Sequence, residues 1–351
     1  MKILCVTNKI GFFTNEKNEL EKKNIFIEII EGLPSENEII SDILKRIKDK
    51  DVIISIDNNL AVNKFIDSLK NIYKVFICVD DPDGAEERSK PFLKFFNHCF
   101  TGAIMYNSKK SMIEKYLEWG AKKADYWLLG IFENRYDSNL KKEEILGKER
   151  DIDLIHVGNP QNKTARLLKI YKAFPKMRLY GRTFGIKGLL RTYWHIIKRK
   201  KGWYEDIPLF DLDLIKMFLH ARELTDLEVV RIRQRSKIEI NFHQSYGPGN
   251  IRLFDSTANG EMQICDCYEG LGKVFTVGKE VIVFQDEKEA IKKIKYYLKK
   301  DAERKKIALA GWKRCLKDYK RITLWEKSLK KIKKGMIEEG INYYKDGTKI
   351  E

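Results

Sequence analysis

Short apolar segments with the pattern of β-strands alternate with amphipathic segments along most of this chain. In the first half, the predicted strands and helices follow one another at 2–7, 36–48, 51–56, 60–71, 75–79, 99–105, 109–118 and 124–129. Strands separated by helices are typical of a parallel sheet, because parallel neighbours need a long crossover connection. The alternation therefore predicts an α/β fold built on a doubly wound sheet.

The alternation restarts later in the chain. A charged stretch with little periodicity separates the two runs and predicts a linker at 136–150. The later predicted elements are 152–158, a helix ending near 174, 178–181, 211–235, 237–243, 251–259, 262–265, 281–284, 287–299, 301–318 and 323–335. We therefore expect two Rossmann-like domains, at 1–135 and 151–322, with a C-terminal segment 323–351 that packs back on the first. Such domains bind ligands beyond the carboxyl ends of their strands and leave a cleft between them.

Basic residues are in large excess. The chain has 68 Lys and Arg against 51 Asp and Glu, which gives a formal net charge of +17. This charge attracts polyanions, namely nucleic acid, an anionic membrane surface or a phosphorylated substrate, and does not choose among them. The basic runs at 198–201, 292–306 and 327–334 also have the pattern of ordinary solvated helix faces.

No apolar run approaches the length of a membrane span, and residues 1–6 have the pattern of a strand rather than of a signal peptide. We therefore expect a cytoplasmic protein, including a position at the inner membrane surface. The six cysteines are scattered at 5, 78, 99, 265, 267 and 315, and no second pair or His cluster complements the closely spaced two. Buried reduced thiols are expected, and a metal site is not.

A glycine-containing loop joins the predicted strand 237–243 to a helix that begins near 251, and Asn250 is a suitable N-cap. Arg252 then lies in the first helical turn, where its charge opposes the helix dipole. A bound phosphate would reverse that effect, since free N–H groups and Arg252 would converge on it, and Asp255 could accept hydrogen bonds from sugar hydroxyls. A surface Arg–Asp pair on an ordinary helix explains the same residues, so both interpretations stay open.

Two carboxylates follow the predicted strand 75–79. Asp80 and Asp81 would lie at its carboxyl end, where a carboxylate can accept the proton of an attacking hydroxyl. Capping or formation of a turn by residues 80–84 explains them equally well. Asp81 and Asp83 also have the spacing of a D-x-D metal motif, but the turn is the stronger interpretation, so the predicted site contains no metal.

The second half of the chain resembles CgeB-like glycosyltransferases of the GT-B fold. The segments that carry the resemblance are 153–158 with Arg166 in the next helix, 237–241 with 252–255 and 258–260, and 278–281 with 290–298 and 303–308. Together they span about 150–330, in the order and spacing of that family. The first half agrees more loosely, through 80–82 and 118–121.

The resemblance implies a metal-independent GT-B glycosyltransferase whose second domain holds a nucleotide-diphosphate sugar. UDP is the expected nucleotide, and no separate cofactor is expected. The residues that it implies for the diphosphate are Arg252, Arg166, Lys163, Gly158, Gly249 and Asn250. It further implies that the carboxylate of Asp255 holds the ribose.

The chain departs from its relatives at two positions. The family usually carries Glu where this chain has Asp255, so the carboxylate is kept on a shorter side chain. Related sugar transferases carry another Glu where this chain has Gly247. The sugar must therefore be held otherwise, and Gly247, the neighbouring loop amides and His243 are the candidates for the sugar pocket.

Three functions fit this sequence. The first is transfer of a sugar to a hydroxyl of a cell-envelope or lipid-linked glycan, with contact to an anionic membrane surface as an option. The second is transfer to a hydroxylated base in DNA, because the chain also resembles phage DNA β-glucosyltransferase and its basic, aromatic stretch 186–210 is suited to stack on an extruded base. The third is a non-catalytic module that binds polyanions on a GT-B scaffold.

Overall fold

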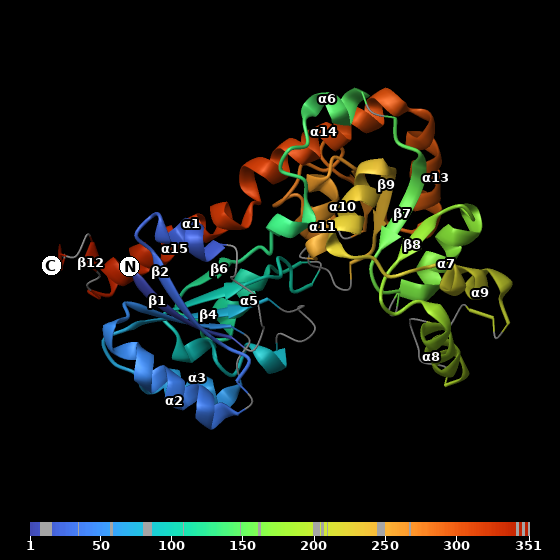
Figure 1. The fold of residues 1–351 in the computed structure, drawn as a ribbon. Helices are drawn as coiled ribbons and strands as arrows, with labels where there is room; N and C mark the ends of the chain where they lie inside the picture. The colour runs from blue at the N-terminus through green and yellow to red at the C-terminus, as the bar shows by residue number, and fades with distance from the viewer. Residues whose placement is uncertain are drawn as a thin grey trace. The chain divides into compact units, whose positions relative to one another are not determined.

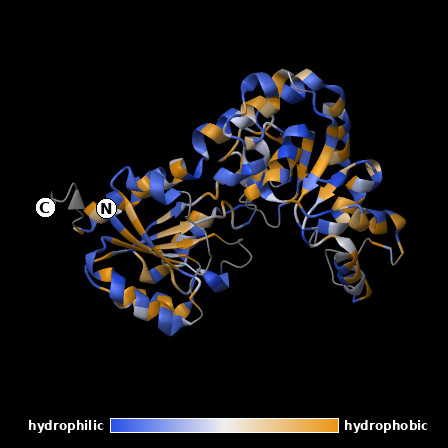
Figure 2. Ribbon diagram, in the orientation of Figure 1, coloured by the Kyte–Doolittle hydropathy of each residue, from blue (hydrophilic) through white to orange (hydrophobic). Residues whose placement is uncertain are grey.

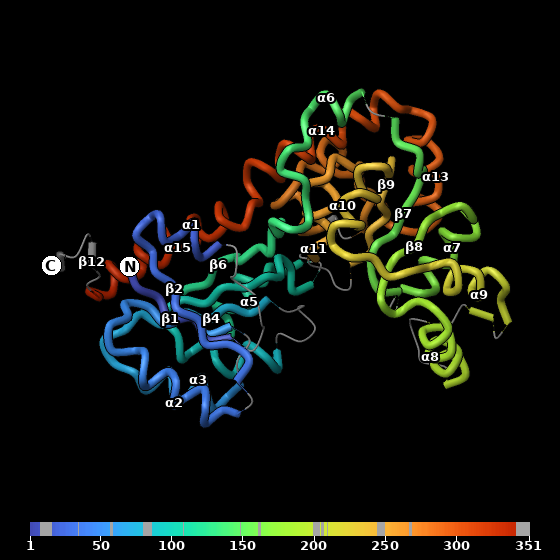
Figure 3. The backbone as a smooth tube through the Cα atoms, in the orientation of Figure 1, coloured from blue at the N-terminus to red at the C-terminus, as the bar shows by residue number. Residues whose placement is uncertain are grey.

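The computed structural model describes most of the chain, which divides into two compact units (Figures 1 and 3). The described residues are 1–7, 16–33, 35–56, 59–79, 86–107, 109–147, 149–160, 163–198, 204, 207–208, 210–243, 250–266, 268–341, 344–345 and 348–349. Unit 1 contains Met1–Leu129 and Lys320–Glu351, and unit 2 contains Gly130–Gln244 and Asn250–Tyr319. The chain therefore leaves unit 1, completes unit 2 and returns.

Unit 1 is built on a parallel six-stranded sheet of order β2-β1-β3-β4-β5-β6. The strands are β1 (Lys2–Thr7), β2 (Phe26–Glu31), β3 (Val52–Ile56), β4 (Tyr73–Cys78), β5 (His98–Thr101) and β6 (Ala124–Tyr126). The helices are α1 (Glu16–Glu21), α2 (Glu36–Arg46), α3 (Leu60–Ser68), α5 (Met112–Glu118) and α15 (Arg321–Glu338), with short 3₁₀ turns at Ile47–Asp49 and Leu93–Phe95.

Both faces of this sheet are buried, as parallel sheets require. Neighbouring residues of β1 point to opposite faces, so that Ile3 lies in the cluster that includes α15 and Leu4 lies in the cluster that includes α2 and α3. Figure 2 shows the consequence, since the inner strands are mostly hydrophobic and the helices carry a hydrophilic side. Side-chain caps fix the starts of α2, α3 and α5; Ser111 and Glu114, for example, form a capping box at α5.

The C-terminal helix α15 belongs to the core of unit 1. Trp325 packs edge-to-face on Trp127 with ring centroids 4.5 Å apart, and Arg321 forms a buried ion pair with Glu16. At Gly335 a Cβ atom would lie 2.0 Å from the hydroxyl of Tyr73, so only glycine allows the helix to approach the sheet this closely. The segment 323–351, expected to pack on the first domain, thus contributes a helix to unit 1 that begins at Arg321.

Two elements of unit 1 were not predicted from the sequence, the helix α1 and the strand β2. β2 lies at the edge of the sheet and pairs only with β1. Its sequence mixes exposed and half-buried positions, including Glu28 and Glu31, so it lacks the continuous apolar run by which the inner strands were recognised. The strands expected at 99–105 and 124–129 are also shorter, ending at Thr101 and Tyr126.

Unit 2 is built on a parallel five-stranded sheet of order β11-β10-β9-β7-β8. The strands are β7 (Ile152–Val157), β8 (Arg178–Tyr180), β9 (Ser236–Asn241), β10 (Met262–Cys265) and β11 (Ile282–Val283). The helices are α6 (Lys142–Gly147), α7 (Thr164–Ala173), α8 (Gly185–Ile197), α9 (Leu212–Leu219), α10 (Asp226–Arg235), α11 (Ile251–Ala258), α12 (Tyr268–Leu271), α13 (Glu287–Lys299) and α14 (Asp301–Asp318), with a 3₁₀ turn at Glu133–Arg135.

The strand order of unit 2 reverses at β7. The chain runs from β7 to β8 on one side and then to β9 on the other side of β7. In open α/β sheets this reversal separates the loops at the carboxyl ends of the strands and leaves a crevice for a ligand. The fold therefore places the ligand crevice of unit 2 at the loops that follow β7 and β9.

The segment 136–150, expected to be a linker, is part of unit 2. It contains α6, whose Ile145 is buried, and Arg150, whose guanidinium donates to the carbonyl oxygens of Arg233 and Ser236 at 2.7 Å. The division between the units also lies near residue 130 rather than at 135. The high charge of this stretch concealed one buried side chain per turn, which is enough to anchor a short helix.

Candidate active site

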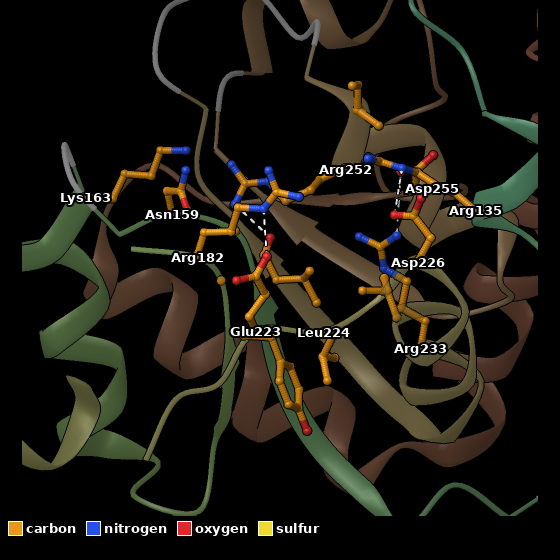
Figure 4. Close-up of a pocket in the computed structure, with 16 residues that line it drawn as sticks. Arg135, Asn159, Lys163, Arg182, Glu223, Leu224, Asp226, Arg233, Arg252 and Asp255 are labelled. Carbon is orange, nitrogen blue, oxygen red and sulfur yellow. Dashed lines mark hydrogen bonds and ion pairs between the residues drawn. The ribbon is translucent and has the colours of Figure 1, made fainter. Parts of the chain in front are cut away.

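A pocket of about 470 Å³ opens at the carboxyl ends of β7 and β8 in unit 2 (Figure 4). Its lining includes the residues that end these strands, Val157 and Tyr180, and the glycines that follow them, Gly158 and Gly181. The charged residues of the lining are Arg135, Lys163, Arg182, Arg233, Arg252, Glu223, Asp226 and Asp255. With five cations against three carboxylates, the pocket is suited to an anionic ligand.

Asn250 connects the start of α11 to the end of β9. Its side chain accepts the backbone N–H of Leu253 at 3.0 Å and so caps the helix, as the sequence predicted. The same side chain exchanges two hydrogen bonds of 3.0 Å with the amide of Asn241, the last residue of β9. These bonds use both lone pairs of the Asn250 side-chain oxygen but only one of its two amide N–H groups, so the other N–H and the backbone remain the groups that can meet a diphosphate.

Arg252 extends from the first turn of α11 toward the ends of β7 and β9. Its Nη1 donates to the carbonyl oxygen of Val157 at 3.1 Å, and its Nη2 donates to that of Phe242 at 3.3 Å. Among the residues that the structure describes, no carboxylate forms an ion pair with Arg252. The half-buried guanidinium therefore keeps its full positive charge at the pocket wall, although burial lowers the pKa of Arg252.

His156 supports this arginine as a neutral ring. Burial, reinforced by the charge of Arg252, holds the pKa of His156 well below its usual range. The Nδ1–H donates to the carbonyl oxygen of Ile240 at 2.9 Å, which leaves the Nε2 lone pair to accept from Arg252 at 3.3 Å. The sequence suggested a structural or surface role for His156; the structure places it in the interior, where it orients Arg252 and adds no charge.

Gly158 makes room for Arg252. Its φ of +143° lies in the region that favours glycine, and a Cβ atom there would lie 2.5 Å from Nη1 of Arg252. Gly181, which follows β8, is needed for a similar close approach, because a Cβ atom there would lie 2.5 Å from the carbonyl oxygen of Gly158. The two glycines allow β7 and β8 to end close together under the open part of the pocket.

Lys163 lies at the start of α7 and also lines the pocket. Its side chain is mostly buried, and its Nζ donates to the carbonyl oxygen of Phe242, which also accepts from Arg252. Figure 4 shows Lys163 and Asn159 on the side of Arg252 that lies away from Asp255. Three residues predicted from the sequence for a diphosphate, Arg252, Lys163 and Gly158, thus meet in one pocket.

Asp255 lies on the other side of Arg252 in the pocket lining, between two arginines (Figure 4). Its Oδ2 is 3.5 Å from Nη1 of Arg135 and 3.8 Å from Nη1 of Arg233. Burial raises the pKa of Asp255 to about 7 despite these two positive neighbours. Its Oδ1 has no hydrogen-bond partner within the described part of the chain, so this oxygen can accept a bond from a ligand.

A buried charge cluster supports Asp255 from below. Arg233 donates from Nε to Oε2 of Glu239 at 2.9 Å and from Nη2 to its Oε1 at 3.4 Å, and both side chains are buried. Burial, with the nearby charge of Glu239, raises the pKa of Glu261 well above its usual range. The signal that could have revealed this cluster is Glu239 itself, a charge inside a predicted strand of a parallel sheet, because such sheets are buried on both faces.

Arg166 does not line the pocket, although the sequence predicted it for the diphosphate. Its guanidinium lies 4.7 Å from the ring centroid of Phe242 and donates to Asp266 at 2.6 Å and to Glu287 at 2.5 Å. Two carboxylates thus compensate its charge. They lie about 100 residues further along the chain, where inspection of the sequence gave no reason to pair them with it.

His243, a candidate for the sugar pocket, lies directly after β9 and outside the lining just described. Its backbone N–H and its Nδ1 both bond Oδ1 of Asp266, at 2.7 and 2.9 Å. The remaining ring nitrogen, Nε2, is buried and has no partner among the described residues, so its role in a sugar pocket stays a prediction. The other candidates Asp80, Asp81, Gly247 and Gly249 lie outside the described residues.

Arg182 and Glu223 are among the lining residues that sequence reasoning missed. Arg182, which is 83% exposed, forms an ion pair of 2.8 Å with Glu223 at the rim (Figure 4). Both follow short elements without a motif, so only the fold brings them together.

In the described part of the chain, no group of His, Cys, Asp and Glu side chains has the arrangement of a metal site. None of the described helices is long and apolar enough to cross a bilayer. The described cysteines form no disulfide with one another and are buried.

Comparisons with known proteins agree with this geometry. Residues 165–327 match the family described as Glycosyl transferase-like, and no curated protein matches the sequence. Among solved structures, HepE of Anabaena in complex with UDP and glucose has a TM-score of 0.62 and 11% identity, covering 95% of this chain and 100% of its own. Sucrose-phosphate synthase of Thermosynechococcus elongatus has a TM-score of 0.62 and 11% identity, covering 94% and 98%.

An α-glucosyltransferase in complex with UDP-glucose and DNA containing an abasic site has a TM-score of 0.60 and 10% identity, covering 94% of this chain and 98% of its own. Identities this low show the fold alone, and the predicted α/β GT-B architecture is confirmed. Together with the family match, it supports a glycosyltransferase. The match is to the broader family, so the narrower CgeB-like resemblance stays a prediction.

Proposed function

Because residues 165–327 form a glycosyl transferase-like domain within a GT-B fold, we propose that this protein is a glycosyltransferase that takes its sugar from a UDP-sugar. The observation that carries the proposal is Arg252, a pocket-wall guanidinium that contacts only neutral acceptors among the described residues. A cation without a compensating carboxylate is costly to a fold and is kept where an anionic ligand completes it.

The donor diphosphate would lie between Arg252, Lys163 and the backbone of Gly158. The N-terminus of α11 adds its unpaired N–H groups to this position. When the sugar departs, negative charge grows on the diphosphate, and fixed cations stabilise that charge without reorganisation. Arg252 and Lys163, which the fold already orients, would thus supply the leaving-group stabilisation that a metal ion supplies in other enzymes, and we propose a metal-independent reaction.

The carboxylate of Asp255 would hold the ribose hydroxyls through its unoccupied Oδ1. The apolar lining by Tyr180, Leu224 and Val229 offers a flat surface to the base. Support for uridine comes from the two neighbouring structures whose complexes contain UDP or UDP-glucose. The acceptor hydroxyl would lose its proton to Asp80 or Asp81, as the sequence predicted.

For the acceptor we propose a cell-envelope or lipid-linked glycan. A second candidate is a hydroxylated base in DNA, favoured by the net charge of +17 and by the similar α-glucosyltransferase that was solved with DNA. Retention on duplex DNA over a salt series separates the two, because binding through phosphates weakens steeply as salt rises. Indifference to DNA at 50 mM salt would remove the second candidate.

The donor is tested with the full chain and a panel of UDP, GDP, dTDP and their sugars. A ligand at 100 times its dissociation constant stabilises the native state by about 2.7 kcal/mol, which raises the melting temperature measurably. We expect UDP and a UDP-sugar to do this and the other nucleotides to do less. The proposal is wrong if no nucleotide shifts the melting temperature; donor binding without any turnover or hydrolysis would instead favour a non-catalytic module.

A further inference from the structure

The helix α8 in unit 2 exposes an apolar face. Four of its side chains form this face, Ile186, Leu190, Trp194 and Ile197, and they are 66%, 63%, 49% and 67% exposed. Their spacing of four, four and three residues places them on one side of the helix. The opposite side of α8 is anchored, since Ile196 and Thr192 are buried and Ile196 belongs to the core of unit 2. We call the four exposed side chains the α8 face.

Exposed apolar residues on most other described helices occur singly, such as Leu44 on α2 and Ile337 on α15, and α9 carries two, Leu212 and Leu219. The α8 face is different because it is contiguous and has a charged border. Lys187, Arg191 and Lys198 are exposed and lie along one edge of the α8 face. At a rotation of 100° per residue, they lie 100° to 140° around the helix axis from Ile186. Nζ of Lys198 lies 4.2 Å from the ring centroid of Trp194, and α8 contains no acidic residue.

We propose that the α8 face docks this protein on an anionic lipid bilayer. An apolar stripe bordered by cations is the pattern of a helix that lies in the plane of a membrane interface, with Trp at the level of the headgroups. The apolar side chains enter the acyl boundary, while Lys187, Arg191 and Lys198 meet the lipid phosphates. The helix of 13 residues is about 20 Å long, which is enough for several headgroups.

Two other binding partners, nucleic acid and a second copy of the chain, match the chemistry of the α8 face less well. Bases of nucleic acid stack on aromatic rings, but three of the four residues of the α8 face are aliphatic. A second copy of the chain would bring two identical cationic borders together across a two-fold axis, which is repulsive. The charge complementarity therefore selects an anionic bilayer. None of these side chains lines the donor pocket, so this inference stands apart from the proposed function.

The test is cosedimentation of the full chain with vesicles of phosphatidylcholine containing 30% phosphatidylglycerol, and with pure phosphatidylcholine. The variant Leu190→Glu/Ile197→Glu should lose at least about tenfold in partitioning to the anionic vesicles. The matched control Leu44→Glu/Ile337→Glu adds the same two charges at similarly exposed positions and should bind like the unaltered protein. Lys187→Gln/Arg191→Gln should weaken binding severalfold, and Lys292→Gln/Lys295→Gln, on the exposed side of α13, should not.

A second readout reports where the helix lies. Lipids brominated on the acyl chains should quench tryptophan fluorescence, and Trp194→Phe should remove most of that quenching. Absence of binding to anionic vesicles at 50 mM salt, or equal loss in the matched control, overturns the proposal. So does a Leu190→Glu/Ile197→Glu variant that loses DNA retention or dimer formation while its vesicle binding is unchanged.

Discussion

Two charged regions lie along the same helix, α11, and they are built in opposite ways. At its first turn, Arg252 contacts the neutral ring of His156 and two carbonyl oxygens. One turn later, Asp255 lies between Arg135 and Arg233, and Arg233 in turn forms a bidentate pair with the buried Glu239. The first region leaves a positive charge uncompensated, whereas the second surrounds each charge with its opposite.

This difference indicates that the first region serves ligand binding and the second serves the stability of the fold. A buried cluster of paired charges is costly to break, because removal of one partner leaves the other unpaired in the interior. An unpaired cation at a pocket wall contributes little to folding and is available to a ligand. We therefore expect changes at Arg233 to appear mainly in stability, and changes at Arg252 mainly in donor affinity. The experiments below test this division from the largest expected effect to the smallest.

Replacement of Arg233 by Met should lower the free energy of unfolding by about 3–5 kcal/mol, since it leaves Glu239 and Asp255 without their buried cation. Urea unfolding measures this directly. The matched control is Arg235→Met on the same helix, because Arg235 pairs with Asp151 on the surface and should cost less than about 1 kcal/mol. Equal losses in the two variants would show that the cluster gives no special support.

Asp255 should make stability depend on pH. Its folded pKa of about 7 lies above the value of an unfolded aspartate, so the folded state keeps a proton that the unfolded chain releases. Stability should therefore fall as pH rises from about 4 to about 7 and then level off, by at most about 1.4 kcal/mol per pH unit. Asp255→Asn should flatten this fall in melts recorded across the range. A slope that survives the substitution would assign it to another group, and Glu261 would be examined next.

Replacement of Arg252 by Ala should weaken UDP binding about 100-fold, since charge-assisted bonds to a diphosphate are lost. The free energy of unfolding should change by about 1 kcal/mol or less, because only bonds to neutral acceptors disappear. Calorimetric titration and urea unfolding of the same preparation give both numbers. Arg178→Ala, at the exposed start of β8, is the control and should bind UDP normally. A stability loss as large as that of Arg233→Met would erase the distinction between the regions.

Replacement of Gly158 by Ala should cost about 1–3 kcal/mol, through its positive φ and the clash with Arg252. The part due to the clash should vanish in the double variant with Arg252→Ala, and a double-mutant cycle measures it. Gly272→Ala is the control, since a Cβ atom there meets nothing within 4 Å. Additive effects in the cycle would show that the two residues do not interact in solution.

The sequence was sufficient where the signal is local. The apolar runs of β1, β3 and β4 predicted their strands, and Asn250 and Arg252 were placed at the start of a helix by capping preference alone. The resemblance to GT-B glycosyltransferases, rather than local reasoning, implied that Arg252, Lys163 and Gly158 share one site.

The sequence was insufficient where a partner lies far along the chain. Arg166 had the right type and position for a diphosphate, but Asp266 and Glu287 compensate its charge, and their approach depends on the sheet order. For Asp255 the sequence left open a bond to sugar hydroxyls and a surface pair with Arg252 on the helix, and the structure buries it beside Arg233. Periodicity shows which face of a helix is apolar and does not show which charges meet beneath it.

The return of α15 to unit 1 has a consequence for biosynthesis. Trp127 and Tyr73 leave the ribosome early, but Trp325 and Gly335, against which they pack, are translated only after all of unit 2. One face of the first sheet therefore stays uncovered during most of translation, while unit 2 can close its own core first. The N-terminal half of this chain thus matures last, and it needs protection from aggregation for as long as the ribosome takes to reach the final helix.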